Sequence, residues 1–151
     1  MKNLIKTLII FAFAIIIASC SKDQKCVNWL EGEWNVVKWE VTDSNGITVD
    51  LIAASSGTVS GKMEFTKYNV KNDENGHAIR YVYINTQGNT VTQTYHYDYK
   101  IQDDCETAWI KEEGSSTADL YSIEESSKTK MIFSDYNENS KETLRITIEK
   151  Q

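Results

Sequence analysis

Residues 30–41 read LEGEWNVVKWEV, and this stretch decides the fold. Gly32 stands two residues before Trp34, at the entrance to a segment in which apolar and polar residues alternate. Glycine lets the backbone bend or approach a neighbour closely. Tryptophan supplies a large apolar plate that can plug the end of a barrel. The stretch therefore predicts the first strand of a small β-barrel, with structural roles for Gly32 and Trp34.

The rest of the chain consists of segments in which apolar and polar residues alternate, separated by residues typical of turns. It contains no proline and shows no long amphipathic helix. A change of apolar parity predicts a bulge near Thr66. Asn45-Gly46 predicts a hairpin turn before a short strand at 47–52, and 53–61 is expected to be a loop with one helical turn. The main strands are predicted at residues 34–41, 62–71, 78–84, 90–101, 108–112, 119–124, 129–134 and 142–149.

Eight consecutive antiparallel strands, each with one apolar face, can close into an up-and-down barrel that leaves no strand edge exposed. At eight strands the interior is just wide enough to be filled by side chains or to hold one small ligand. The predicted fold class is therefore all-β, an eight-stranded antiparallel up-and-down barrel. A two-sheet β-sandwich is the alternative.

Residues 1–19 have the pattern of a signal peptide. Lys2 and Lys6 precede an uninterrupted apolar or small-residue run of 11 residues from Leu8 to Ala18. That length suits a signal-peptide core and is too short for a spanning helix. The run ends in Ile17-Ala18-Ser19-Cys20, which resembles a bacterial lipobox. Cys20 is therefore the expected site of lipid attachment, with palmitate among the acyl chains; an ordinary secretory signal followed by a chance cysteine is the alternative.

Several acyl chains on one cysteine would hold the protein stably in a membrane. The expected location is the cell envelope, with the lipid in the outer membrane and the protein facing the periplasm or the cell surface. The pair Lys22-Asp23 is similar to the sorting signals of surface lipoproteins. The predicted organisation is a signal peptide at 1–19, a lipidated tether at 20–28 and one barrel domain at 29–151.

Charge and cysteine content narrow the function further. The full chain carries a net charge of −6, and loss of the leader makes it −8. An acidic surface repels phosphates, so nucleic-acid binding is disfavoured. The envelope permits disulfides, which leaves Cys26 and Cys105 as a candidate pair worth roughly 4–5 kcal/mol by chain entropy. Two free thiols are the alternative, because the sequence does not show that the Cα atoms come close enough.

Gly32-x-Trp34, the run of strands and the long first loop at 43–61 together resemble the lipocalin-like lipoproteins of Gram-negative bacteria, over residues 29–150. The resemblance implies a cup that binds a small hydrophobic or amphipathic molecule, with the first loop partly covering its mouth. Lipocalins also place an arginine near the last strand against the first-strand tryptophan, and Arg145 is the candidate here. The alternative function is a non-catalytic surface module that recognises a protein or a glycan through an outer face of the barrel.

Aromatic residues are the candidate ligand contacts. Tyrosines concentrate in two neighbouring strands, where they can form a wall whose hydroxyls meet the polar edge of an apolar ligand. Ordinary β-packing is the alternative, because tyrosine favours strands, and outward-facing rings would suit stacking on sugars. The candidate ligand-binding residues are Tyr81, Tyr83, Tyr95, Tyr97, Tyr99, Trp39 and Trp109.

The chain shows no motif for catalysis or metal binding. His96 shares a predicted strand face with Asp98, but no nucleophile is marked beside them, so we do not expect an enzyme. The cysteines and histidines lack zinc-ligand spacing. The turn at 72–76 lacks the later glutamate of a calcium loop. Neither a cofactor nor a metal is expected.

Overall fold

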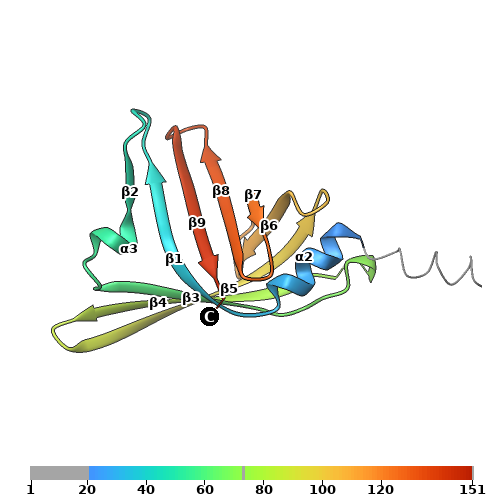
Figure 1. The fold of residues 1–151 in the computed structure, drawn as a ribbon, viewed down its shortest axis with the longest axis horizontal. Helices are drawn as coiled ribbons and strands as arrows, with labels where there is room; N and C mark the ends of the chain where they lie inside the picture. Colours follow the sequence, from blue (N-terminus) through green and yellow to red (C-terminus); the bar gives the residue numbers. More distant parts are fainter. Residues whose placement is uncertain (1–20, 73, 151) are drawn as a thin grey trace, which may run out of the picture.

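The computed structural model describes residues 21–72 and 74–150, so the predicted signal peptide at 1–19 and the lipid site at Cys20 lie outside the described residues. The described residues form two short helices and a 3₁₀ turn around a set of antiparallel strands (Figure 1). In order, the elements are α2 (Lys22–Leu30), β1 (Gly32–Thr42), β2 (Thr48–Asp50), α3 (Leu51–Ala54), β3 (Val59–Phe65), η1 (Val70–Asn72), β4 (Gly76–Thr86), β5 (Asn89–Gln102), β6 (Thr107–Glu112), β7 (Asp119–Ser126), β8 (Lys130–Asn137) and β9 (Glu142–Glu149).

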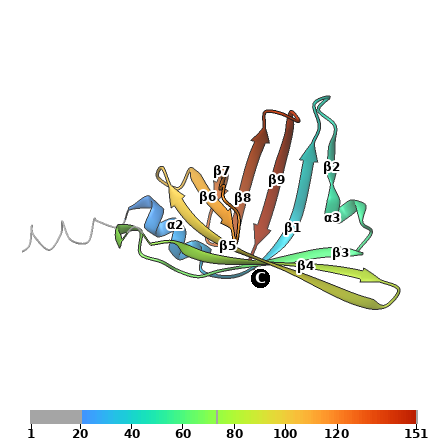
Figure 2. The same cartoon turned by 180° about the vertical axis from the view of Figure 1, so that it is seen from behind.

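Within the described residues, β1 and β3 to β9 form a closed ring of eight strands. Each strand pairs with the next, and β9 returns to pair antiparallel with β1. The extra strand β2 pairs with the far end of β1, where Val41 lies opposite Val49. The predicted up-and-down barrel is therefore confirmed, and the two-sheet alternative is excluded. From behind, the β4–β5 hairpin extends well beyond the other strands (Figure 2).

Strand β3 ends earlier than expected, at Phe65 instead of residue 71. The change of parity that predicted a bulge is instead the point where the chain leaves the sheet. Tyr68 then turns into the core, where its hydroxyl accepts a hydrogen bond from the Ile101 amide at 2.6 Å. The register shifts occur elsewhere, in β1 between Val36 and Lys38 and in β7.

Helix α2 occupies most of the segment predicted to be a tether, so the folded domain begins earlier than residue 29. The Ser21 side chain caps the helix by accepting a hydrogen bond from the Gln24 amide. Cys26, Val27 and Leu30 are completely buried. The helix lies at the end of the barrel where β1 begins, and it closes that end (Figure 1).

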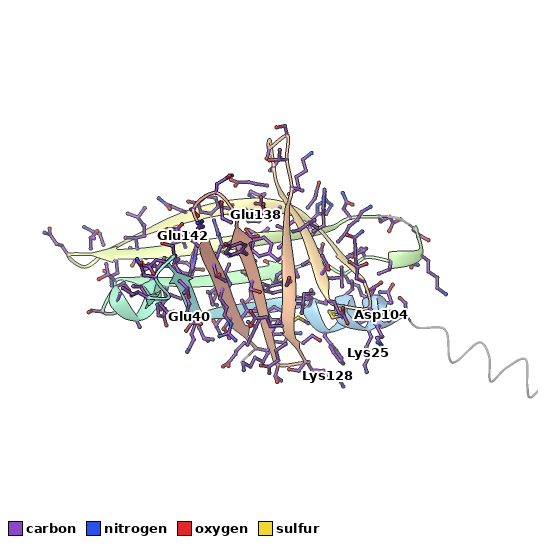
Figure 3. All side chains as sticks on the ribbon, turned by 90° about the horizontal axis from the view of Figure 1, so that it is seen from above. Lys25, Glu40, Asp104, Lys128, Glu138 and Glu142 are labelled. Carbon is purple, nitrogen blue, oxygen red and sulfur yellow. A yellow bond between two sulfur atoms is a disulfide. The ribbon has the colours of Figure 1, made fainter. Side chains whose placement is uncertain are left out.

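A disulfide joins α2 to the β5–β6 turn. Cys26 and Cys105 are bonded, with their Cα atoms 5.9 Å apart, so the predicted pair is confirmed. Asp23 accepts a hydrogen bond from the Cys105 amide at 2.7 Å. Figure 3 shows the sulfur atoms beside Asp104, next to the helix. The helix is thus held to the barrel both covalently and by its own side chains.

Trp34 fills the closed end of the barrel, as its position in the sequence predicts. It is 1% exposed, and its indole nitrogen donates to the Leu30 carbonyl at 2.6 Å. Gly32 has φ of +101°, a conformation that L side chains rarely adopt. The backbone can therefore turn from α2 into β1 at this position and bring the indole under the helix.

The cation beside Trp34 is a lysine and not the expected arginine. Lys150 Nζ lies 4.8 Å from the centre of the Trp34 ring and donates to the carbonyls of Trp29 and Glu31, both at 2.8 Å. Arg145 lies on the outer face and pairs with Glu124 at 2.7 Å and Glu40 at 3.2 Å. The lipocalin-type role of Arg145 is therefore wrong, because its parity in β9 turns it away from the interior.

Candidate functional site

Alternation along β4 and β5 separates the barrel interior from its outer face. Ala78 lies opposite Tyr97, and Arg80 lies opposite Tyr95. These four side chains share the inner face, because directly opposed residues of an antiparallel pair point the same way. Ala78 is buried, and Arg80, Tyr95 and Tyr97 are half-buried. The inner face therefore becomes more open from Ala78 toward the β4–β5 turn.

A cavity of about 50 Å³ lies inside the barrel, midway along its axis. Its closed side is buried and apolar, whereas Arg80, Tyr97, Ile110 and Tyr121 are half-buried. The cavity therefore opens away from the end closed by α2, and it has room for a few water molecules. Its lining residues are Met63, Phe65, Ala78, Arg80, Tyr97, Ile110, Tyr121, Phe133 and Ile146.

Arg80 stands in a ring of aromatic side chains. Its guanidinium carbon lies 5.0 Å from the ring centre of Trp39, 4.5 Å from that of Tyr95 and 5.5 Å from that of Tyr97. Such cation–π contacts are worth about 0.5–2 kcal/mol each, depending on desolvation. Arg80 Nε is buried and has no hydrogen-bond partner among the residues that the structure describes. The contacts hold the charge inside the barrel without satisfying this donor.

Two tyrosine hydroxyls belong to the same cluster. Burial raises the pKa of Tyr97 to about 12, against the lowering effect of the nearby Arg80 charge. Burial also raises the pKa of Tyr121. Both hydroxyls therefore keep their protons at neutral pH and remain hydrogen-bond donors. The side chains of Arg80, Tyr97 and Tyr121 are called the arginine cluster below.

The mouth of the barrel keeps an apolar inner wall. Val49, Val41 and Leu144 lie side by side across β2, β1 and β9, on the same face as Trp39. Val49 is 44% exposed, and the other two are half-buried. Helix α3 packs beside β1 and β3, and its Ile52 reaches the core. The first loop, expected to cover the mouth, instead extends the wall of the barrel along this side.

The structure divides the predicted ligand residues into three groups. Trp39, Tyr95 and Tyr97 come together around Arg80, as the aromatic-wall prediction requires. Tyr99 also faces inward, but it is 1% exposed and belongs to the packed core at the closed end. Its hydroxyl donates to the Thr66 carbonyl at 2.8 Å.

The remaining predicted residues lie on the outside of the barrel. Tyr81 and Tyr83 follow Arg80 at the opposite parity, and their rings stack with centres 6.5 Å apart. Trp109 lies opposite Lys100 on β5 and Leu120 on β7, and Leu120 is 58% exposed. The prediction that these three side chains contribute to an interior wall is therefore corrected.

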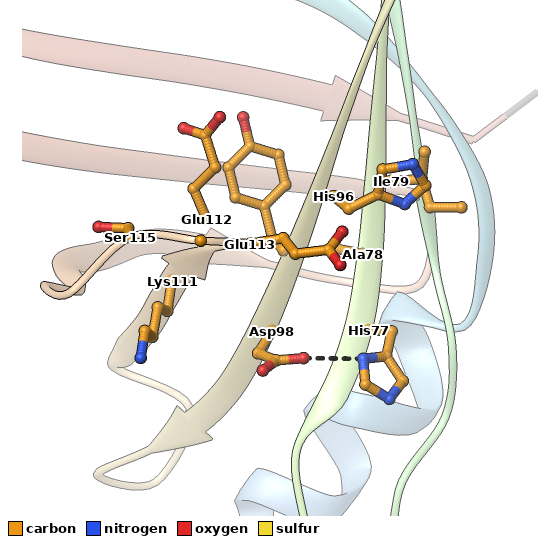
Figure 4. A pocket seen from close by; sticks show the side chains of 11 residues that line it. His77, Ala78, Ile79, His96, Asp98, Lys111, Glu112, Glu113 and Ser115 are labelled. Carbon is orange, nitrogen blue, oxygen red and sulfur yellow. Dashed lines mark ion pairs between the residues drawn. The ribbon is translucent and has the colours of Figure 1, made fainter.

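A second hollow lies on the outer face, against β4, β5 and the β6–β7 turn (Figure 4). It has a volume of about 530 Å³ and is open to solvent. His77 Nδ1 lies 2.8 Å from an oxygen of Asp98, and Lys111 is the next residue across the sheet on the same row. Asp98 therefore pairs with His77, and not with the His96 that shares its strand. This hollow is called the outer groove below.

Arg80 and Tyr121 are the members of the cluster that sequence reasoning missed. Residues 78–84 hold one arginine at the parity of Ala78, Val82 and Ile84. A lone charge on an apolar face of a strand was the available signal. Tyr121 carried no comparable signal, because residues 119–124 place both apolar and polar side chains on each face of the strand.

Residues 21–72 and 74–150 contain no group of three or more histidine, cysteine, aspartate or glutamate side chains placed to hold a metal ion. No helix in this part of the chain is long and apolar enough to cross a membrane.

Comparison with known proteins identifies no family. The chain matches no protein-family model and no curated protein. Among solved structures, it is similar to the redesigned β-barrel mFAP1 bound to DFHBI, with 14% identity over 83% of this chain and 98% of that one and a TM-score of 0.47. It is also similar to the S-type phycobiliprotein lyase CPES from Guillardia theta, with 8% identity over 90% and 96% of the two chains and a TM-score of 0.46. The strand pairing of this chain, and not these likenesses, establishes its barrel.

Proposed function

We propose that this chain is a lipid-anchored envelope lipoprotein of the lipocalin-like kind, whose barrel binds a small hydrophobic or amphipathic molecule without catalysis. The observation that carries the binding proposal is the apolar cavity that opens toward the mouth of the barrel. A closed apolar floor with a few polar groups at its open side is the usual form of a small-molecule site.

The cavity sets how such a molecule would lie. Its volume of about 50 Å³ is well below the roughly 300–1,000 Å³ of pockets that enclose drug-sized ligands. One end of the ligand would therefore enter the cavity, and the rest would lie along the apolar inner wall at Val41 and Leu144. Burial of this wall would stabilise the complex by about 25 cal/mol for each Å² removed from water.

Mass spectrometry of the mature protein purified without denaturation tests the binding proposal. We expect a co-purified apolar or amphipathic molecule, displaced in Ala78→Leu because the larger side chain fills the cavity. Tyr81→Phe is the matched control, since Tyr81 lies on the outer face. A wild-type protein that carries no such molecule and takes up none from a lipid extract of the envelope would contradict the proposal.

The anchor rests on the leader and on Cys20, and it requires a separate test. Cells grown with a clickable palmitate analogue should label the wild-type chain and not Cys20→Ala. Cys26→Ala is a matched control for loss of a cysteine. Equal labelling of wild type and Cys20→Ala would overturn the proposed anchor and leave the binding proposal standing.

The outer groove supports a second candidate, recognition of a protein or a glycan. The stacked Tyr81 and Tyr83 rings offer an aromatic surface beside the polar groove. A glycan array with the double variant Tyr81→Ala, Tyr83→Ala tests it, and Arg80→Gln is the control inside the barrel. Binding by wild type that only the tyrosine double variant loses would favour this function; no binding by wild type would exclude the glycan form of it.

A further inference from the structure

Arg80 brings a positive charge into the barrel and leaves one of its donors unused. The Nε atom is buried, and no hydrogen-bond acceptor reaches it from the described part of the chain. Buried polar groups in proteins nearly always have a partner, and leaving one unsatisfied costs the free energy of removing it from water. An acceptor supplied from outside the chain would remove this cost.

The two tyrosine hydroxyls of the arginine cluster are also available as donors, although Arg80 Nε alone is both buried and unsatisfied among the described residues. Within residues 21–72 and 74–150, neither the Tyr97 hydroxyl nor the Tyr121 hydroxyl makes a hydrogen bond, whereas the Tyr99 hydroxyl does. Both tyrosines line the same cavity as Arg80. Three donor groups therefore meet at the open side of one cavity, and none of them has an acceptor from the described residues.

The carboxylates nearest to the cluster do not supply that acceptor. Glu112, Asp119 and Asp135 share the inner face of β6, β7 and β8 through their pairing with Tyr97, Ile110 and Leu144. Among the described residues, Arg80 forms no ion pair with any of them. They are exposed or half-buried at the rim, and their charges raise the pKa of Tyr97 and Tyr121 after the larger effect of burial.

Building on the proposed function, we infer that the ligand is an amphipathic monocarboxylate whose carboxylate enters the cavity and accepts hydrogen bonds from Arg80, Tyr97 and Tyr121. A guanidinium and a carboxylate form strong, charge-assisted hydrogen bonds. The buried Nε requires that the acceptor comes inside the cup, and the small cavity fits a polar end group better than a chain. The apolar body then lies outward along Val41 and Leu144.

The rim selects for a single negative charge. Glu112, Asp119 and Asp135 repel an entering anion, and this repulsion doubles for a dianion such as a phosphate monoester. Arg80 is the cation among the residues that line the cavity, so it offsets one charge. Among anionic acceptors, a monocarboxylate therefore meets the least repulsion at the rim, and an amine of the same length would place a cation against Arg80.

Isothermal titration calorimetry on the mature chain with Cys20→Ser, prepared without lipid, tests this inference. The probes are decanoate, 1-decanol and decylamine, which share one chain length and differ in the end group. A hydrogen bond to a charged group is worth about 1.5–3 kcal/mol, so decanoate should bind roughly 10- to 100-fold more tightly than 1-decanol. Decylamine should bind most weakly.

Arg80→Gln should reduce decanoate affinity to that of 1-decanol and leave 1-decanol affinity within about twofold. Arg145→Gln is the matched control, because it removes an arginine from the outer face and should preserve the preference. Near-ultraviolet circular dichroism checks that each variant is folded. If Arg80→Gln does not fold, the order of the affinities of the wild-type barrel for the three probes tests the carboxylate inference.

The titrations distinguish a failure of the carboxylate inference from a failure of the proposed ligand-binding function. Equal affinity for decanoate and 1-decanol, or a preference for decylamine, would overturn the carboxylate inference and leave the proposed function intact. Binding of none of the three probes would overturn both. A decanoate preference that survives Arg80→Gln in a folded protein would also overturn the inference, because the selectivity would then arise elsewhere.

Discussion

Gly76 lies against the aromatic core at the closed end of the barrel. A Cβ atom built on it would lie 2.6 Å from Tyr68 Cδ1 and would also overlap the ring of Tyr99. Both rings are buried and meet edge to face at 5.3 Å, so neither can move without disturbing the other. The absence of a side chain at Gly76 is what lets Tyr68 leave the sheet and enter the core.

We therefore expect Gly76→Ala to lower the free energy of unfolding by at least 1–3 kcal/mol through overpacking. Gly61→Ala is the comparison, since its new Cβ would lie 3.3 Å from its nearest neighbours, a tight contact without the overlap found at Gly76. Urea unfolding followed by tyrosine and tryptophan fluorescence measures both. Equal stability of the two variants would contradict the prediction, because it would show that the rings of Tyr68 and Tyr99 leave room for a side chain at position 76.

Trp34 supplies the largest buried side chain of the closed end. Trp34→Ala should cost about 3–5 kcal/mol, because it removes the ring and leaves a cavity. Trp34→Phe keeps an aromatic ring but loses the hydrogen bond to Leu30, so its cost should be smaller. Thermal unfolding of the two variants gives the order; a milder loss in Trp34→Ala than in Trp34→Phe would contradict the role of the ring as a plug.

At the scale of elements, the Cys26–Cys105 bond is the covalent link between α2 and the barrel. It closes a sequence separation of 79 residues, which the chain-entropy model values at about 4–5 kcal/mol. The double variant Cys26→Ser, Cys105→Ser should lose stability of this order, measured as the free energy of unfolding in urea. Adding a reductant should destabilise the wild type and leave the double variant unchanged. Insensitivity of the wild type to complete reduction would contradict the prediction.

The contact of β9 with β1 and β7 through Arg145 should be weak and dependent on pH. Burial raises the pKa of Glu124, but hydrogen bonds from Arg145 and Ser134 outweigh it, so that the net pKa lies below 4.5. A lowered folded-state pKa stabilises the protein above the unfolded-state pKa, and this contribution is lost as the pH falls through the folded value. The groups are partly exposed, so the pair is worth less than about 1 kcal/mol.

Arg145→Gln should therefore cost less than about 1 kcal/mol at pH 7, and the difference from wild type should shrink as the pH falls below 4.5. Urea unfolding at several pH values measures the difference in the free energy of unfolding between Arg145→Gln and wild type. A difference that stays constant or grows as the pH falls would contradict the assignment of the effect to ionised Glu124.

For the whole molecule, the alternation of apolar and polar residues made the closed barrel predictable. It did not make predictable which side chains fill the barrel interior. The clean alternation of residues 142–149 fixed the bounds of β9, and the succession of strands indicated closure. Residues 78–84 were ambiguous, because Val82 and Ile84 on one face and Tyr81 and Tyr83 on the other are all apolar enough to be buried. A change of face inverts every side chain of a strand, so the tyrosines of β4 were assigned to the wrong side.

Helix α2 and the arginine cluster were hidden for a different reason. Cys26, Val27 and Leu30 are too few apolar residues to predict a helix, and the helix forms because they pack under the barrel and Cys26 bonds to Cys105. The cluster joins Arg80 and Tyr97 to Tyr121 across strands that are distant in sequence. Such a site depends on the register of the whole sheet, which one sequence does not specify.

The most direct test of the account is nuclear magnetic resonance of the unlipidated mature protein, with labelled isoleucine and leucine methyl groups and added decanoate. Ile146 lines the cavity, Leu144 lies on the inner wall of the mouth, and Ile79 lies beside the outer groove. We predict intermolecular nuclear Overhauser effects from decanoate to Ile146 and Leu144 and none to Ile79. Effects confined to Ile79, or no effect to any methyl group at saturating decanoate, would contradict the claim that the barrel is a ligand cup.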